Sequence, residues 1–118
     1  MRQEDHEARA LVAFGRKFTA IHEFLDQYFP AYGPCHRIIL HHQRGIDLIK
    51  SIFLREDPAI IQAVAEQHIR DDQDGQLPYD WREFDTTIEY LDHIFAKNTK
   101  QPPGRLIERM KKLYPDSF

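Results

Sequence analysis

The sequence predicts an all-α protein: a small helical bundle of four main helices plus a short C-terminal helix, in a single domain over residues 1–118. Apolar residues recur at spacings of three and four along most of the chain, which is the period of an amphipathic helix. No segment alternates apolar and polar residues as a half-buried strand does. Short runs rich in Pro, Gly and Asp separate the periodic segments, and they divide the predicted bundle into its helices.

The first helix is predicted from an apolar stripe that ends shortly before Pro30 and the segment "AYGP". Gly15 lies within the stripe. Because glycine costs about 1 kcal/mol relative to alanine inside a helix, a break at Gly15 is possible. The stripe consists of Leu11, Phe14, Phe18, Ile21, Leu25 and Tyr28.

The second helix is predicted to run from Pro34, a favourable first-turn residue, to about Leu54. The third is predicted to begin at Asp57 and Pro58, because an Asp followed by Pro supplies an N-cap side chain and a preset φ angle. It continues to Asp72, where the turn-rich segment "DQDGQLP" follows.

The fourth helix is predicted over residues 81–97, "WREFDTTIEYLDHIFAK", and the segment "NTKQPPG" ends it. A short basic helix, "RLIERMKKLY", is predicted over residues 105–114. These C-terminal helices occupy residues 80–118 and follow a core of residues 1–79. The stripe of the fourth helix consists of Phe84, Ile88, Leu91 and Phe95.

Composition narrows the class of protein. The net charge of -3 and the pI of about 6.1 argue against a general nucleic-acid-binding protein, which usually carries a basic excess. No stretch approaches the roughly 18 apolar residues of a membrane span, and the charged N-terminal segment does not resemble a signal peptide. The single cysteine, Cys35, excludes an internal disulfide. We therefore expect a cytoplasmic protein without a membrane partner.

Histidine is unusually abundant, with seven residues in the chain. On a helical wheel drawn through the predicted second helix, His42 lies near the middle of the apolar face and His41 lies on its flank. His36 points the other way, toward solvent or a neighbouring loop. Gly45 follows one turn later, and its lack of a side chain would let another helix or a ligand approach His42.

Two His-x-x-x-Asp pairs, His22 with Asp26 and His68 with Asp72, lie on the first and third predicted helices. This spacing places both side chains on one helix face, roughly 6 Å apart at Cβ. Such a pair can supply two ligands of one metal ion, or a carboxylate that orients an imidazole.

These residues predict an internal divalent metal site built from facing helices. Imidazole and carboxylate ligands are compatible with Zn, Fe, Mn or Ni. If the protein is an enzyme, the predicted chemistry is metal-assisted hydrolysis. The predicted ligands are His22, His42, His68 and Asp72, and the predicted supporting residues are Asp26, His41 and His36.

A second interpretation remains open. A buried unpaired carboxylate costs several kcal/mol, so each Asp needs a partner, and a His–Asp network can serve the core without a metal ion. The protein would then be a non-catalytic interaction protein of phage or bacterial origin. Its partner would be a protein bound through the C-terminal helix or through a patch around Tyr79 and Trp81.

Three segments, "AIHEFLD", "FPAYGPCHRIILHHQRGIDLI" and "AVAEQHIRDDQDGQLP", resemble in this order the motifs of a family of small bacterial and phage proteins, a domain of unknown function. The family motifs are similar to IHxWFD, HRALRHHAEGI and EQHVKEDxGxIPT, and the resemblance covers roughly residues 6–79. It implies a shared fold and site but no reaction. Phe24 occupies the position of the family's tryptophan. The matching residues are His22, Asp26, His36, Arg37, His41, His42, Gly45, Gln67, His68, Asp72 and Pro78.

Overall fold

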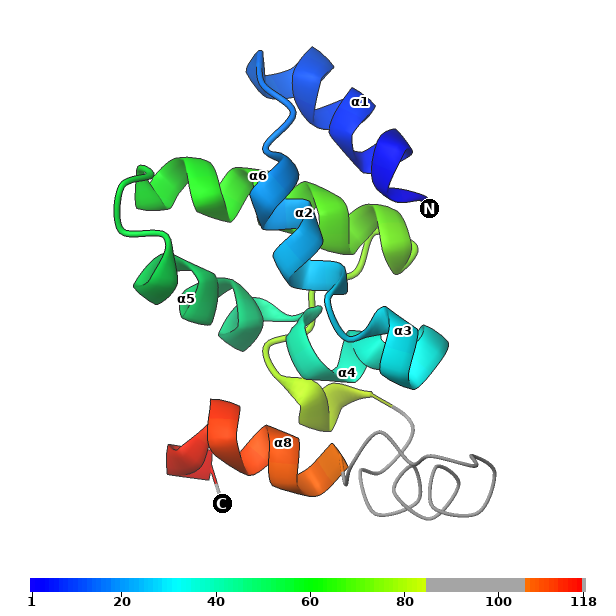
Figure 1. Ribbon diagram of the computed structural model, residues 1–118, viewed down its shortest axis with the longest axis vertical. Coiled ribbons are helices and arrows are strands. Elements are labelled where there is room, and N and C mark those ends of the chain that lie inside the picture. Colours follow the sequence, from blue (N-terminus) through cyan, green and yellow to red (C-terminus); the bar gives the residue numbers. More distant parts are fainter. Residues whose placement is uncertain (85–105, 118) are drawn as a thin grey trace.

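The computed structural model describes residues 1–84 and 106–117, and all regular secondary structure within these ranges is helical (Figure 1). Most of the predicted fourth helix, from residue 85 onward, lies outside the described residues. Its described beginning is a 3-10 turn, η2 (Trp81–Glu83). Within the described ranges, no helix has the length and apolar character needed to cross a membrane.

The predicted first helix is two helices, α1 (Gln3–Phe14) and α2 (Thr19–Asp26). The break occurs at Gly15, whose φ of 80° lies in the left-handed region that favours glycine, so the break allowed by the sequence is confirmed. Both helices contact the long helix α6 (Pro58–Asp72). Because α1 and α2 are separate, each crosses α6 at its own angle (Figure 1).

The predicted second helix is also interrupted. The chain forms α3 (Phe29–Tyr32), the 3-10 turn η1 (Gly33–His36), α4 (Arg37–Leu40) and α5 (Gln43–Ile52). The last break lies at His41 and His42, and the extended backbone of His42, with φ of -158° and ψ of 173°, makes it the N-cap of α5. A wheel drawn through residues 34–54 therefore does not describe this region.

Gly45 has a different role from the one predicted. A Cβ atom built on Gly45 would lie 2.0 Å from the backbone oxygen of Leu40. The space beside Gly45 is therefore filled by the preceding helix, not by another helix or a ligand. The glycine permits the tight turn between α4 and α5.

Helix α6 forms as predicted. The side chain of Asp57 accepts a hydrogen bond from the backbone N–H of Ala59 at 2.8 Å, and Pro58 is the first helical residue. The helix contacts α1, α2 and α5, and therefore passes through the centre of the described fold (Figure 1). Its buried face carries Ile61, Val64 and His68.

The C-terminal residues form α8 (Leu106–Leu113) and the 3-10 turn η3 (Pro115–Ser117), which confirms the predicted short helix. The hydroxyl of Tyr114 donates a hydrogen bond to the carbonyl oxygen of Ile39 at 2.7 Å and so ties this end of the chain to α4. The bundle of four main helices is not confirmed, because two predicted helices are divided and another lies largely outside the described residues.

One apolar core joins these elements. Leu25 of α2, Ile39 of α4, Ile49 of α5 and Ile69 of α6 are all fully buried. Burying a side chain of this size contributes about 1.5–3 kcal/mol. This core holds the ends of α2, α4 and α6 in fixed positions, and Asp26, His41 and Asp72 lie at these ends.

Candidate metal centre

Six histidines lie in the described residues, and all six are buried. Four of them direct Nε2 toward the carboxylates of Asp26 and Asp72. We call these four histidines and two aspartates the His/Asp cluster. Its members come from α1, from the end of α2, from η1, from the residue after α4 and from α6: His6, Asp26, His36, His41, His68 and Asp72.

Four residues form the centre of the cluster, and their ligand atoms all lie within 4.8 Å of one another. The Nε2 atom of His41 lies 3.5 Å from Asp26 Oδ1 and 3.1 Å from Asp72 Oδ2. The Nε2 atom of His68 lies 3.2 Å from Asp26 Oδ1 and 3.3 Å from Asp72 Oδ2. Nitrogen and oxygen thus alternate around a closed ring. The edges of this ring, 3.1–3.5 Å, are close to the roughly 3.3 Å between ligand atoms of a tetrahedral zinc site with bonds of about 2.0–2.1 Å, whereas separations of up to 4.8 Å exceed those of a tetrahedron.

The other two histidines extend the ring at opposite ends. His36 Nε2 lies 3.2 Å from Asp26 Oδ1, and His6 Nε2 lies 3.1 Å from Asp72 Oδ1. The ring of His6 also stacks on that of His68, with 3.6 Å between the centroids. The cluster therefore offers up to six ligand atoms of the kinds that divalent transition metals bind.

The other nitrogen of His36 fixes the tautomer of its ring. Nδ1 lies 2.7 Å from the carbonyl oxygen of Gly33, and because a carbonyl only accepts, Nδ1 must carry the hydrogen. A neutral His36 then presents the lone pair of Nε2 to a carboxylate oxygen of Asp26, which is also an acceptor. This contact is favourable only if a positive charge is present, either a second proton on the ring or a metal ion between the two atoms.

His22 lies behind the cluster instead of within it. Its Nδ1 is 2.9 Å from Nδ1 of His68, so one of the two nitrogens donates to the other. Burial, together with electrostatic repulsion from the neighbouring imidazoles, lowers the pKa of His22 to about 4, and the ring is neutral at pH 7. If His68 donates through Nδ1, its Nε2 is free to bind a metal ion. His22 is thus placed as a support for His68, although the sequence predicted it as a ligand.

The two carboxylates are charged at neutral pH. Burial alone would raise the pKa of Asp26, but hydrogen bonds from His36, His41 and His68 outweigh burial and hold the pKa well below its usual range. The pKa of Asp72 is lowered in the same way, by bonds from His41, His6 and His68 that outweigh its burial. The side chain of Asp72 is only 4% exposed. Two negative charges are therefore held in a mostly buried place, where one divalent cation would neutralise them.

His41 and His68 respond differently to the same carboxylates. Burial lowers the pKa of His41 despite its bonds to Asp26 and Asp72. For His68 the bonds to these two carboxylates outweigh burial, and the pKa is raised. A neutral His41 can offer a lone pair to a metal ion, as binding requires.

His42 is not part of the cluster. Its Nε2 donates to the carbonyl oxygens of Ile38 and Ile39 at 3.1 and 3.0 Å, and its Nδ1 accepts from the backbone N–H of Gly45 at 3.1 Å. Burial lowers its pKa to about 4. Both nitrogens are occupied by the backbone, so the structure gives no support to the predicted ligand role. The wheel placed His42 correctly inside the protein, but the chain break turns it away from the carboxylates.

The structure brings together more residues than the sequence suggested. His68 and Asp72 lie at the centre, as predicted. Asp26 and His41 were predicted as supporting residues, but they belong to the central four. His36, expected to face solvent or a loop, is only 4% exposed and contacts Asp26.

His6 was not singled out from the sequence. Ala10, one turn further along α1, is completely buried, and this i, i+4 pair in an otherwise charged segment was the available signal.

Comparison of the chain with protein-family models, with curated proteins and with solved structures finds no match.

Proposed function

We propose that this protein binds a divalent transition metal ion at the His/Asp cluster and uses it for metal-assisted hydrolysis. Asp26, His41, His68 and Asp72 would hold the ion, and His6 and His36 could complete its coordination. The observation that carries the proposal is the convergence of four imidazole Nε2 atoms on two carboxylates, with Nδ1 of His36 bonded to the carbonyl oxygen of Gly33.

Charge also favours a metal ion over a purely structural network. Without an ion, the N-terminal ammonium group, which lies 3.3 Å from Asp72 Oδ1, balances part of the charge of the two carboxylates, and the rest needs protons on buried imidazoles. A single divalent cation balances both carboxylates and leaves every histidine neutral, which is the form that binds metals.

The ligand set is compatible with Zn, Fe, Mn or Ni. Four protein ligands would close a tetrahedral zinc site, so hydrolysis at the central four residues requires a five-coordinate ion that also binds water. If one of His6 and His36 also binds, a six-coordinate Mn, Fe or Ni ion keeps its sixth position for water. In either case, hydrolysis requires one position occupied by water, whose pKa a bound metal ion lowers to about 7.

The test is metal analysis of the purified full-length chain and of two neighbouring aspartate variants. We expect about one or more metal ions per chain in the wild type and a loss of most of this metal in Asp72→Asn. Asp71→Asn is the matched control, because Asp71 pairs with Arg9 near the surface and takes no part in the cluster. A folded wild type that takes up no divalent metal, or an Asp71→Asn variant that loses metal as Asp72→Asn does, would contradict the proposal.

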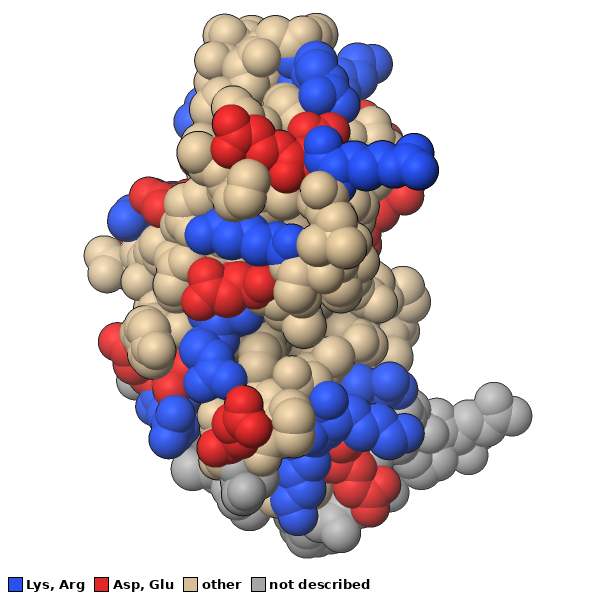
Figure 2. All heavy atoms as spheres, turned by 90° about the vertical axis from the view of Figure 1, so that its left-hand side faces the viewer, with Lys and Arg blue, Asp and Glu red and all other residues tan. Residues whose placement is uncertain are grey.

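The interaction-protein interpretation has less support from the described residues. Trp81 is only 5% exposed and its ring stacks on Tyr114, so it anchors the fold and does not form a surface patch. Tyr79 remains exposed. Positive and negative side chains alternate over the face shown in Figure 2, which does not favour a nucleic-acid partner there. Binding of a partner protein through α8 remains a prediction.

The resemblance to the uncharacterised bacterial and phage family also remains a proposal. Five of the residues that carry it are members of the His/Asp cluster, which supports a shared metal site. These residues are Asp26, His36, His41, His68 and Asp72.

A further inference from the structure

A cavity of about 630 Å³ opens directly beside the His/Asp cluster. Asp26, His36 and Asp72 form part of its wall, and Phe29 and Arg37 form another part. Its volume is within the range of about 300–1,000 Å³ that is usual for small-molecule sites. A molecule in this cavity can therefore reach the proposed metal ion.

Arg37 is the unusual residue of this cavity. Its Nε is buried and has no hydrogen-bond partner within residues 1–84 and 106–117. A buried guanidinium N–H without a partner is costly, and in a native structure it requires an explanation such as an ordered water molecule or a bound ion. Arg37 follows His36 directly in the chain, so a charged donor and a candidate metal ligand enter the cavity from adjacent positions.

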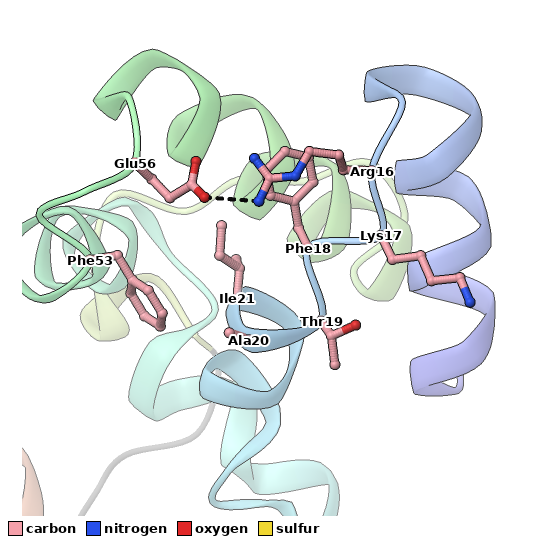
Figure 3. Close-up of a pocket in the computed structure, with 8 residues that line it drawn as sticks. All are labelled: Arg16, Lys17, Phe18, Thr19, Ala20, Ile21, Phe53 and Glu56. Atoms are coloured by element: carbon pink, nitrogen blue, oxygen red, sulfur yellow. Dashed lines mark hydrogen bonds and ion pairs between the residues drawn. The ribbon is translucent and has the colours of Figure 1, made fainter.

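The protein has a second cavity, in which the lining arginine forms an ion pair (Figure 3). This cavity, of about 360 Å³, is lined by Arg16, whose guanidinium lies 3.0 Å from Glu56 and covers the ring of Phe18 at 4.5 Å. Arg16 already has an acidic partner within the chain. Arg37 has no acidic partner among the described residues, so within this part of the chain its charge is not paired.

We propose that the cavity beside the cluster binds the phosphate group of a small phosphate monoester, held between the metal ion and Arg37. This inference rests on the proposed metal site. A guanidinium binds phosphate oxygens in pairs, and a divalent metal ion binds a further oxygen. Phe29, which is 54% exposed, offers an apolar surface to the organic part of the ester.

The reaction inferred is hydrolysis of the ester. The oxygen of a water molecule forms a bond to phosphorus, and the bond between phosphorus and the ester oxygen breaks. One proton of the water goes to the leaving oxygen, which departs as an alcohol, and the other stays on the inorganic phosphate. Arg37 would compensate the charge on the phosphate oxygens during this step.

The experiment measures binding of inorganic phosphate to the full chain loaded with metal, by calorimetry, after elemental analysis has established the metal content. We expect Arg37→Gln to keep its metal and to bind phosphate at least about tenfold more weakly, because it loses a charge-assisted pair of hydrogen bonds. Arg16→Gln is the matched control and should bind phosphate as the wild type does. Hydrolysis of p-nitrophenyl phosphate by wild type should fall in parallel in Arg37→Gln.

Unchanged phosphate affinity in a metal-loaded Arg37→Gln variant would overturn the inference, as would a metal-loaded wild type that binds no phosphate. Both outcomes leave the metal site itself intact. If Arg37→Gln does not fold, the Arg37→Lys variant tests the inference instead. Lysine keeps the positive charge but cannot make the bidentate contact of a guanidinium, so its phosphate affinity should be about threefold lower. If elemental analysis finds no metal in the wild type, that result contradicts the proposed function. Because this inference rests on the metal site, it is then contradicted as well.

Discussion

His41 and His42 are adjacent in the chain and both are completely buried, yet they have opposite surroundings. Nε2 of His41 faces two carboxylates from other helices, while both nitrogens of His42 bond to nearby backbone groups. Burial therefore does not identify a metal ligand. The groups that face the ring identify it, and here a single turn between α4 and α5 decides which histidine meets carboxylates.

The largest expected difference between these two neighbours is in metal affinity. His41→Ala removes a central ligand and should weaken metal binding by roughly a hundredfold or more. His42→Asn should leave metal affinity unchanged, because asparagine can still accept the N–H of Gly45 as an N-cap. Competition with a chelating dye measures both. If His42→Asn loses metal as strongly as His41→Ala, the distinction between the two histidines is wrong.

The turn itself can be broken at Gly45. A methyl group there would collide with the backbone of Leu40, so Gly45→Ala should lower the free energy of unfolding by about 3 kcal/mol or more. Because the same turn positions His41, metal affinity should fall as well. Urea denaturation of the metal-free protein and a metal titration measure the two effects. Ser51→Ala, at an exposed position of α5, is the control and should change neither by much.

His42 should also make stability depend on pH. Its pKa is about 4 in the folded protein, against 6.5 for an ordinary histidine, so the unfolded chain binds more protons between these values. The free energy of unfolding should therefore decrease as pH falls from about 6.5 to about 4, by up to about 3 kcal/mol from this residue. His42→Asn should have a shallower pH dependence in urea denaturation of metal-free protein. Equal slopes for wild type and variant would contradict the assigned burial effect.

The smallest effect expected concerns His22, which supports the cluster from behind. His22→Ala removes the partner of His68 Nδ1 and should weaken metal binding about tenfold, less than loss of a direct ligand. A chelator competition series that includes His41→Ala gives the ranking. If His22→Ala abolishes binding as His41→Ala does, His22 is itself a ligand, as the sequence first suggested.

Some of this architecture follows directly from the sequence. Asp57 and Pro58 predict the start of α6 from two adjacent residues. His68 and Asp72 are four residues apart on α6, so they lie on one face of the helix whatever packs against it. The break at Gly15 likewise follows from the conformational preference of one residue. These features depend on neighbours in the chain, which a sequence displays.

The features that were missed depend on distant contacts. The apolar period continues through residues 38–49, so it conceals the break at His42, which Gly45 and Leu40 make possible by close approach. A helical wheel cannot reveal that break. His36 and His6 reach the cluster only because η1 and α1 pack against Asp26 and Asp72, and the polar sequence around His6 carries little sign of this burial.

X-ray absorption spectroscopy of the metal-loaded chain tests the central claim most directly. The account predicts nitrogen and oxygen ligands at about 2.0–2.2 Å, with outer-shell scattering from at least two imidazole rings. This imidazole signal should diminish in His41→Ala and persist in His42→Asn. A bound ion surrounded only by oxygen, or an imidazole signal that disappears with His42 and not with His41, would contradict it.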